Sequence, residues 1–119
     1  KSIGKEYFEI SEETAERLND SKSKGKKIIA VGTSTVRALE SAYENGKVRP
    51  YNGYTNLFIK PGYNFKFIDA LITNFHLPNS THLILICAFA DSEIIEKAYK
   101  IAIEKKYRFY SYGDSMMII

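Results

Sequence analysis

The stretch KIIAVGTSTVRALESA, residues 27–42, decides the fold class. Its first part is a continuous apolar run at 28–31, which lacks the polar alternation of a strand with one face in water. Gly32 ends the run, and apolar residues then recur at the spacing of a helix. The pattern predicts a strand at 27–31 that is covered on both faces, followed by a helix with Thr33 as its N-cap.

Strands and helices alternate along the rest of the chain. Ser11 and Asp91 are good N-caps for two further helices, and Asn45-Gly46 is a good stop for the helix of the deciding stretch. We interpret the apolar segment 83–90 as a buried helix, with a strand as the alternative. Further strands are expected at 55–59, 70–75, 107–112 and 116–119, and turns at 51–53 and 61–62. This alternation predicts the α/β class with a mainly parallel sheet.

The composition is that of a globular protein. With 119 residues, the chain is one domain or a piece of one. The apolar fraction of 45% and the charged fraction of 26% are ordinary values, which excludes disorder and a coiled coil. No signal peptide is visible, and no apolar run reaches the roughly 18 residues that span a bilayer. The single cysteine, Cys87, is interpreted as a buried structural thiol, which fits the cytoplasmic location that we expect.

The chain carries a net charge of +3, and much of the excess lies in one lysine cluster. The cluster consists of Lys22, Lys24, Lys26 and Lys27. One interpretation is a solvated loop, because lysine is a common surface residue. The other is a contact with the phosphates of a nucleic acid, where lysines release counterions. The sequence leaves both interpretations open.

The first stretch that can carry chemistry follows the strand at 27–31, where ligands bind in open α/β sheets. Thr33, Ser34 and Thr35 begin a helix whose free N–H groups suit an anion, and Arg37 stands one turn further on. The alternative is structural, with Thr33 capping the helix and Arg37 in a surface salt bridge. The chain has no Walker lysine and no glycine-rich dinucleotide motif, which disfavours the standard nucleotide-binding loops.

The second stretch, residues 69–78, places Asn74 and His76 between a predicted strand and a rigid proline. A histidine in this place can serve as a general acid or base, or can donate a hydrogen bond to a ribose hydroxyl. The alternative is that both side chains tie down a turn. His76 and His82 lack the spacing of a helical metal pair, so we predict no metal.

The third stretch, residues 110–115, places Tyr112 before a Gly-Asp turn. Tyr112 can stack on a base, and Asp114 can pair with a ribose or a cation. The alternative is an ordinary turn in which Tyr112 packs on the core.

Several segments together resemble one known family. They are EYFEIS at 6–11, VGTSTVRALES at 31–41, TNLFIKPGYNFKFIDALITNFHLPNST at 55–81, AFADSEIIEKAY at 88–99 and YRFYSYGDSM at 107–116. In this order, and over nearly the whole chain, they resemble the S-adenosylmethionine:tRNA ribosyltransferase-isomerases of queuosine biosynthesis. The chain departs from the family pattern at four positions: Lys1 and Gly4, where histidines are expected, Ser34, where threonine is expected, and Asp91, where glycine is expected.

The resemblance implies a fold and an activity. The family enzyme has a layered α/β/α sandwich with a mainly parallel sheet and a second domain that is a β-barrel. Residues 1–119 would be a single portion of the α/β domain, at the C-terminal end of a longer protein, and inactive when isolated. The enzyme transfers and isomerises the ribosyl moiety of S-adenosylmethionine onto 7-aminomethyl-7-deazaguanine in the anticodon loop of tRNA. The products are epoxyqueuosine in tRNA, adenine and methionine, and the enzyme is a monomer that uses S-adenosylmethionine as a co-substrate and needs no metal.

The resemblance, with the chemistry of the three stretches, gives each candidate residue a role. His76 or Asp114 is the catalytic base, and Asn74 holds the ribose. Tyr112 stacks on the adenine or on the acceptor base. The anchor for an anionic group, such as the methionine carboxylate, consists of Thr33, Ser34, Thr35 and Arg37.

Two other functions compete with this one. A non-catalytic RNA-binding module would explain the positive charge and the 9 tyrosines and 7 phenylalanines. No RNA-binding signature is visible, however, and the aromatic residues lie mostly in predicted strands. The third possibility is an α/β enzyme that acts on a free nucleotide. Steep weakening of binding with salt would favour contacts with tRNA phosphates over a small ligand.

Overall fold

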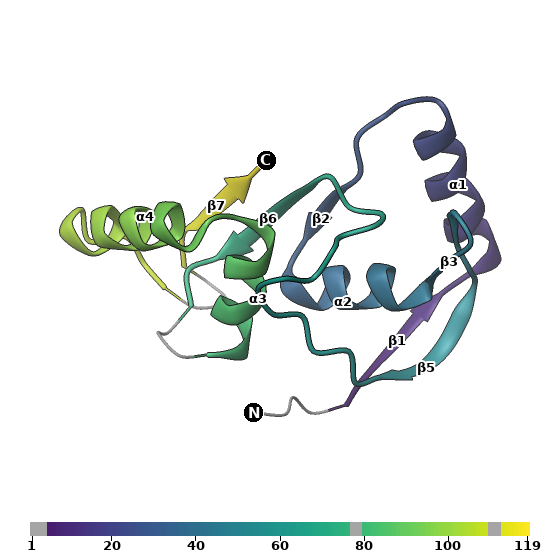
Figure 1. Ribbon diagram of the computed structural model, residues 1–119, viewed down its shortest axis with the longest axis horizontal. Helices are drawn as coiled ribbons and strands as arrows, with labels where there is room; N and C mark the ends of the chain where they lie inside the picture. The colour runs from purple at the N-terminus through teal and green to yellow at the C-terminus, as the bar shows by residue number, and fades with distance from the viewer. Residues whose placement is uncertain (1–4, 77–79, 110–112) are drawn as a thin grey trace.

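The computed structural model describes residues 5–76, 80–109 and 113–119, and these residues form a mixed α/β structure (Figure 1). The helices are α1 (Glu12–Ser23), α2 (Thr33–Ala42), α3 (Thr81–Phe89) and α4 (Ser92–Glu104). The strands are β1 (Glu6–Ile10), β2 (Ile29–Val31), β3 (Tyr43–Glu44), β4 (Lys47–Val48), β5 (Tyr51–Thr55), β6 (Ala70–Asn74) and β7 (Ser115–Ile118). The predicted α/β class is therefore confirmed.

The central sheet has three strands in the order β2-β6-β7. Strand β6 is parallel to β2 and antiparallel to β7. The remaining pairs, β1 with β5 and β3 with β4, are antiparallel. Within the described residues, the central sheet is therefore mixed, and β2 with β6 is the single parallel pair.

Every residue of strand β2 is apolar, but the described residues cover only one of its two faces. Ala30 is buried, whereas Ile29 and Val31 are 45% and 65% exposed. Met117 of β7 is paired with Ile72, which is paired with Val31, so these side chains share the exposed face. The prediction of a strand covered on both faces is wrong for the described residues, because an apolar run alone does not say what packs against it.

Helix α2 begins at Thr33, the residue that was predicted to be its cap. Gly32 is the N-cap, with φ 93°, and Thr33 is the first helical residue. A positive φ suits glycine, which lets the chain turn sharply from β2 into α2. The hydroxyl of Thr33 is therefore free to bond to another element instead of capping its own helix.

The Asn45-Gly46 pair is a hairpin turn and not a helix stop. Helix α2 ends at Ala42, and β3 then pairs with β4 across these two residues. Asn45 and Gly46 have φ 51° and 87°, the left-handed conformations that a two-residue hairpin requires.

Residues 51–53, predicted as a turn, form part of strand β5. Tyr51 pairs with Ile10 and Gly53 with Phe8 in an antiparallel ribbon of β1 and β5. The strand predicted at 55–59 is also wrong, because β5 ends at Thr55 and residues 56–59 belong to no strand. The stacking of Tyr51 on Phe8, with ring centroids 5.0 Å apart, helps to hold the ribbon together.

The C-terminal half agrees more closely with prediction. Segment 83–90 adopts the helical alternative as part of α3, which ends at Phe89; Leu85 and Ile86 are buried and the other described residues of 83–90 are half-buried. Ser80 caps α3 and Asp91 caps α4, as their side chains accept hydrogen bonds from Leu83 N–H and Glu93 N–H. Strands β6 and β7 lie where strands were expected. Residues 107–109 are not a strand, and the rest of the strand predicted at 107–112 lies outside the described residues.

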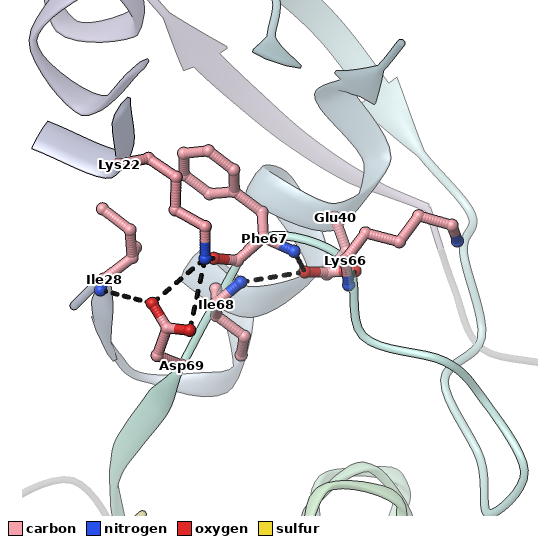
Figure 2. Close-up of polar contacts among 7 residues, drawn as sticks. All are labelled: Lys22, Ile28, Glu40, Lys66, Phe67, Ile68 and Asp69. Atoms are coloured by element: carbon pink, nitrogen blue, oxygen red, sulfur yellow. Dashed lines mark hydrogen bonds and ion pairs between the residues drawn. The ribbon is translucent and has the colours of Figure 1, made fainter. Parts of the chain in front are cut away.

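Two carboxylates hold the loop that leads from β5 into β6 (Figure 2). The buried carboxylate of Glu40 accepts the main-chain N–H groups of Lys66, Phe67 and Ile68 at 2.9–3.2 Å. The carboxylate of Asp69 accepts a hydrogen bond from the N–H of Ile28 at 2.8 Å, and it forms an ion pair with Lys22 at 3.1 Å. Together these bonds fix residues 66–69, and so set where β6 begins.

The same network affects two pKa values. Burial, and then the carboxylate of Glu40, raise the pKa of Tyr63, whose hydroxyl donates to Glu40 at 2.9 Å. Burial alone would raise the pKa of Asp69, but the Ile28 N–H and the Lys22 ammonium outweigh it and lower that pKa. Of the predicted lysine cluster, Lys22 is therefore a structural cation.

Candidate functional site

The candidate site lies at the edge of the central sheet where β2 and β6 end. Gly32 donates its N–H to Ile72 O at 2.8 Å, so the turn after β2 lies beside the end of β6. Helix α2 begins directly after this turn, and α3 begins a few residues after β6. This carboxyl edge is where ligands bind in open α/β sheets.

Two histidines meet at this edge. The rings of His76 and His82 are stacked, with centroids 4.6 Å apart and planes 14° apart. His82 Nδ1 lies 2.7 Å from Thr33 Oγ1, which ties the start of α3 to the start of α2. The stack and the bond bring residues from β6, α2 and α3 into one cluster, which we call the histidine edge: Thr33, Thr73, His76 and His82.

His76 has protein contacts on its ring and on its main chain. Its Nε2 lies 3.0 Å from Thr73 Oγ1, and its N–H donates to Tyr99 Oη at 2.8 Å. Burial, and then the neighbouring His82, lower the pKa of His76 below its ordinary value. A lowered pKa keeps the imidazole neutral near neutral pH, which is the form that accepts a proton.

Asp114 lies next to this edge. Its main-chain O accepts the N–H of Phe75 at 3.4 Å, and its carboxylate accepts the N–H of Arg108 at 2.6 Å. The Arg108 guanidinium lies 3.8 Å from the carboxylate, which is 38% exposed. The carboxylate thus ties Asp114 to Arg108 and still reaches solvent.

Of the two remaining predicted site residues, the structure describes Asn74. Asn74 pairs with Ser115 in the sheet, and the residue is half-buried at the end of β6. Tyr112, predicted to stack on a base, lies outside the described residues.

Arg37 belongs to a second, separate cluster. Its guanidinium donates to Glu6 Oε1 at 2.7 Å and to Leu57 O at 3.1 Å, and its side chain is 7% exposed. The hydroxyl of Ser34 also donates a hydrogen bond to Glu6, at Oε2. We call Arg37, Glu6 and Ser34 the arginine cluster; it ties α2 to β1 and to the segment after β5.

The four residues predicted to form one anion site therefore face different partners. Thr33 contacts His82, and the hydroxyl of Thr35 turns back to Val31 O at 2.8 Å. Ser34 and Arg37 contact Glu6. Their predicted role as an anchor stays a prediction. In the ion pair of Arg37, the arginine side chain is buried at 7% exposed, whereas Glu6 is 39% exposed.

Several surface hollows in the described part of the chain lie away from the histidine edge. One lies along the β1–β5 ribbon and is lined by Glu9, Ile10, Ser11, Pro50, Tyr51 and Asn52. Another lies along α1 and is lined by Glu16, Arg17, Asn19, Asp20, Ser23 and Lys47. We place the site at the histidine edge, because that is where titratable groups converge with the ends of strands.

The described residues hold neither a metal-binding cluster nor a membrane-spanning helix. Within 5–76, 80–109 and 113–119, no group of three or more histidine, cysteine, aspartate or glutamate side chains could hold a metal ion. No helix in the same residues is long and apolar enough to cross a membrane.

The sequence did not reveal the partners of His76. The spacing of His76 and His82 argues against a helical metal pair, but it does not show that the two rings stack. Tyr99 lies 23 residues away on α4, too far along the chain for a local pattern to pair it with His76. A signal was nevertheless present, since a tyrosine on the buried side of an amphipathic helix needs a partner for its hydroxyl.

The whole chain has clear relatives among known proteins. Residues 1–118 match a family described as queuosine biosynthesis protein. The S-adenosylmethionine:tRNA ribosyltransferase-isomerase of Carboxydothermus hydrogenoformans is 56% identical over 114 residues, which are 96% of this chain and 34% of that protein. The same enzyme of Halothermothrix orenii is 56% identical over 115 residues, again 96% and 34%.

A solved structure has the same fold. The S-adenosylmethionine tRNA ribosyltransferase of Thermotoga maritima is 44% identical to this chain with a TM-score of 0.88. The match covers 95% of this chain and 40% of that one. The chain thus spans about a third of the length of the curated relatives that it matches.

Proposed function

Because the chain belongs to the family of queuosine biosynthesis proteins, we propose that the full-length protein that carries it is an S-adenosylmethionine:tRNA ribosyltransferase-isomerase. The reaction moves the ribosyl moiety of S-adenosylmethionine to 7-aminomethyl-7-deazaguanine in the anticodon loop of tRNA. It yields epoxyqueuosine in tRNA, adenine and methionine. The observation that carries the proposal is the match over residues 1–118 to a family whose relatives bear this enzyme's name.

The chemistry requires a base near the sugar. The sulfonium makes the adjacent 5′ carbon acidic, and loss of a proton there begins the reaction. Adenine is then expelled, the aminomethyl nitrogen attacks, an epoxide closes and methionine leaves. His76 is our candidate for the base, since its lowered pKa favours the neutral imidazole.

Asp114 and Asn74 complete the proposed sugar site. Asp114 is the alternative base, because its main chain is bonded to Phe75, which precedes His76, and its carboxylate is 38% exposed. Asn74 is the last residue of β6, and its side chain would hold the ribose hydroxyls. Tyr112 would stack on the adenine or on the acceptor base, as the aromatic rings of nucleic-acid-binding proteins do.

The methionine carboxylate needs a cation or N–H donors. We retain the N-terminus of α2, with Thr33, Ser34 and Thr35, as its proposed anchor, because helix N-termini favour anions. Arg37 can contribute only if its contact with Glu6 opens or is shared. Its burial makes a structural contribution the stronger of its two roles.

The whole protein is proposed to have the architecture that the resemblance implies. This is a layered α/β/α sandwich with a mainly parallel sheet, joined to a β-barrel, in a cytoplasmic monomer without a resident metal. The exposed apolar side chains of Ile29, Val31 and Met117 support a further layer on that face of the sheet. Residues 1–119 would be one portion of the sandwich domain.

The proposal is tested by following adenine. The full-length protein is incubated with S-adenosylmethionine and tRNA that carries 7-aminomethyl-7-deazaguanine, and free adenine is measured by chromatography. The control is the same tRNA with unmodified guanine. We expect adenine with the modified tRNA alone. Folded protein that binds tRNA but releases no adenine above the control would contradict the proposal and favour a non-catalytic RNA-binding module.

A further inference from the structure

The imidazole of His76 is bonded at one ring nitrogen. Nε2 lies 3.0 Å from Thr73 Oγ1, whereas Nδ1 makes no hydrogen bond within the part of the chain that the structure describes. Thr73 itself is buried, 3% exposed, so its hydroxyl depends on protein partners. The bond between these two residues therefore bears on which nitrogen of His76 carries the proton.

The hydroxyl of Thr73 has one proton and two neighbours. Thr73 Oγ1 lies 3.4 Å from Asn74 O, which can only accept, and 3.0 Å from His76 Nε2. If the hydroxyl donates to the carbonyl, Nε2 must be the protonated nitrogen that donates to Oγ1. In the opposite tautomer the single hydroxyl proton would go to Nε2, and Asn74 O would lose its bond, so one contact would be made where the Nε2–H tautomer makes two. The arrangement thus favours a proton on Nε2 and a free lone pair on Nδ1.

Tyr99 fixes the main chain of the same residue. Its ring is buried against Phe75 and Phe109, with centroids 5.2 and 5.9 Å away, and its hydroxyl accepts the His76 N–H at 2.8 Å. Tyr99 lies on α4, so a packed helix determines where the end of β6 places its histidine. The stacked ring of His82 limits the tilt of the imidazole from a third side.

We propose that Thr73 and Tyr99 are positioning residues for the reaction, and that they hold His76 with Nδ1 as the nitrogen that takes the proton. The inference rests on the proposed function, in which His76 is the base. In the step, the C–H bond at the 5′ carbon breaks and its electron pair stays on the carbon beside the sulfonium. The proton forms a new N–H bond at Nδ1, while the Nε2–H bond to Thr73 is kept. The imidazolium that results is therefore bonded to the protein throughout.

The tautomer can be measured without any activity. Histidines of the full-length protein are labelled with ¹⁵N, and two-bond proton–nitrogen correlations show which ring nitrogen of His76 is protonated. The His76 signals are assigned by their loss in His76→Gln. We expect the Nε2–H form in the wild type, the same form in Thr73→Ser, and a mixture of tautomers in Thr73→Val. A wild-type protein with the proton on Nδ1 would overturn the inference, even if Thr73→Val failed to fold.

Kinetics test the positioning roles. We expect Thr73→Val and Tyr99→Phe to lower kcat about tenfold while KM for S-adenosylmethionine changes by less than about twofold. Thr73→Ser should restore most of the rate, because it keeps the hydroxyl. Tyr43→Phe is the matched control, since Tyr43 packs against Phe67 away from the histidine edge and should keep the wild-type rate.

The outcomes separate the two proposals. Folded Thr73→Val and Tyr99→Phe proteins with wild-type kcat would overturn the positioning roles. Full turnover in His76→Ala would instead remove His76 as the base and overturn the catalytic assignment. The tautomer measured in the wild type would still stand in that case, so the two failures are distinguishable.

Discussion

The histidine edge and the arginine cluster both involve the first turn of α2, but they differ in how completely the protein uses their polar groups. In the arginine cluster the guanidinium is 7% exposed and is bonded to Glu6 and to main-chain carbonyls. At the histidine edge, His76 is half-buried and has a ring nitrogen without a hydrogen bond in the described residues. A group that the fold has already satisfied holds the fold together, whereas a fixed group with unused capacity can act on a ligand.

The largest predicted effect separates the two clusters by activity. His76→Ala in the full-length protein should lower kcat by at least about 100-fold, the range expected for a lost general base. Its unfolding free energy should fall by about 1 kcal/mol, because the buried hydroxyl of Thr73 loses one of its two hydrogen-bond neighbours. The measurement is single-turnover adenine release alongside urea unfolding. An active His76→Ala variant would leave Asp114 as the candidate base.

The second prediction concerns the arginine cluster, where we expect the main effect on stability and not on activity. Arg37→Met should lower the free energy of unfolding by about 2–3 kcal/mol, because Glu6 and two carbonyls lose a buried partner. Chemical denaturation measures this effect, with Arg17→Met on the exposed face of α1 as the control. Wild-type stability would contradict the structural role of Arg37. A raised KM for S-adenosylmethionine in a variant that remains folded would support the additional anchor role.

The third prediction concerns pH. Because the folded protein lowers the pKa of His76, kcat/KM should stay high as pH falls through the ordinary histidine range near roughly 6.5, and should fall only below it. The same shift contributes stability that is present above the unfolded pKa and is lost as pH falls through the folded pKa. A pH–rate profile that falls off above the ordinary histidine pKa would contradict the assignment.

The smallest predicted effect concerns His82. Its ring lies against His76 and helps to lower the pKa of that residue, after burial. His82→Asn should therefore move the acidic limb of the pH–rate profile to higher pH by a fraction of a unit, with little change in the maximal rate. An unchanged or downward shift would show that the two rings are not coupled.

The sequence predicted local features of this fold better than it predicted which elements contact one another. The caps Ser11 and Asp91 and the strand that ends in Asn74 were correct because capping chemistry and apolar runs are local. Asn45-Gly46 was misassigned, because the pair suits both a helix stop and a hairpin turn. The exposed face of β2 was missed for a related reason, since apolar character does not say what covers a strand.

The candidate site was predictable as a place but not as a geometry. Polar residues after apolar strands pointed to the sheet edge that holds His76 and Asp114. The contact between His76 and His82 depends on how β6 and α3 are joined, and the pair of Arg37 with Glu6 spans 31 residues. Such pairings follow from tertiary packing, which no local pattern encodes, so one predicted anion site became two clusters.

The most direct test of the account follows the proton that His76 is proposed to take. S-adenosylmethionine deuterated at the 5′ carbon is incubated with the full-length protein and the modified tRNA, and loss of deuterium is measured by mass spectrometry in the wild type and in His76→Ala. We expect deuterium loss with the wild type and almost none with the folded variant. Deuterium loss at the wild-type rate in His76→Ala would contradict the assignment of the histidine edge as the catalytic site.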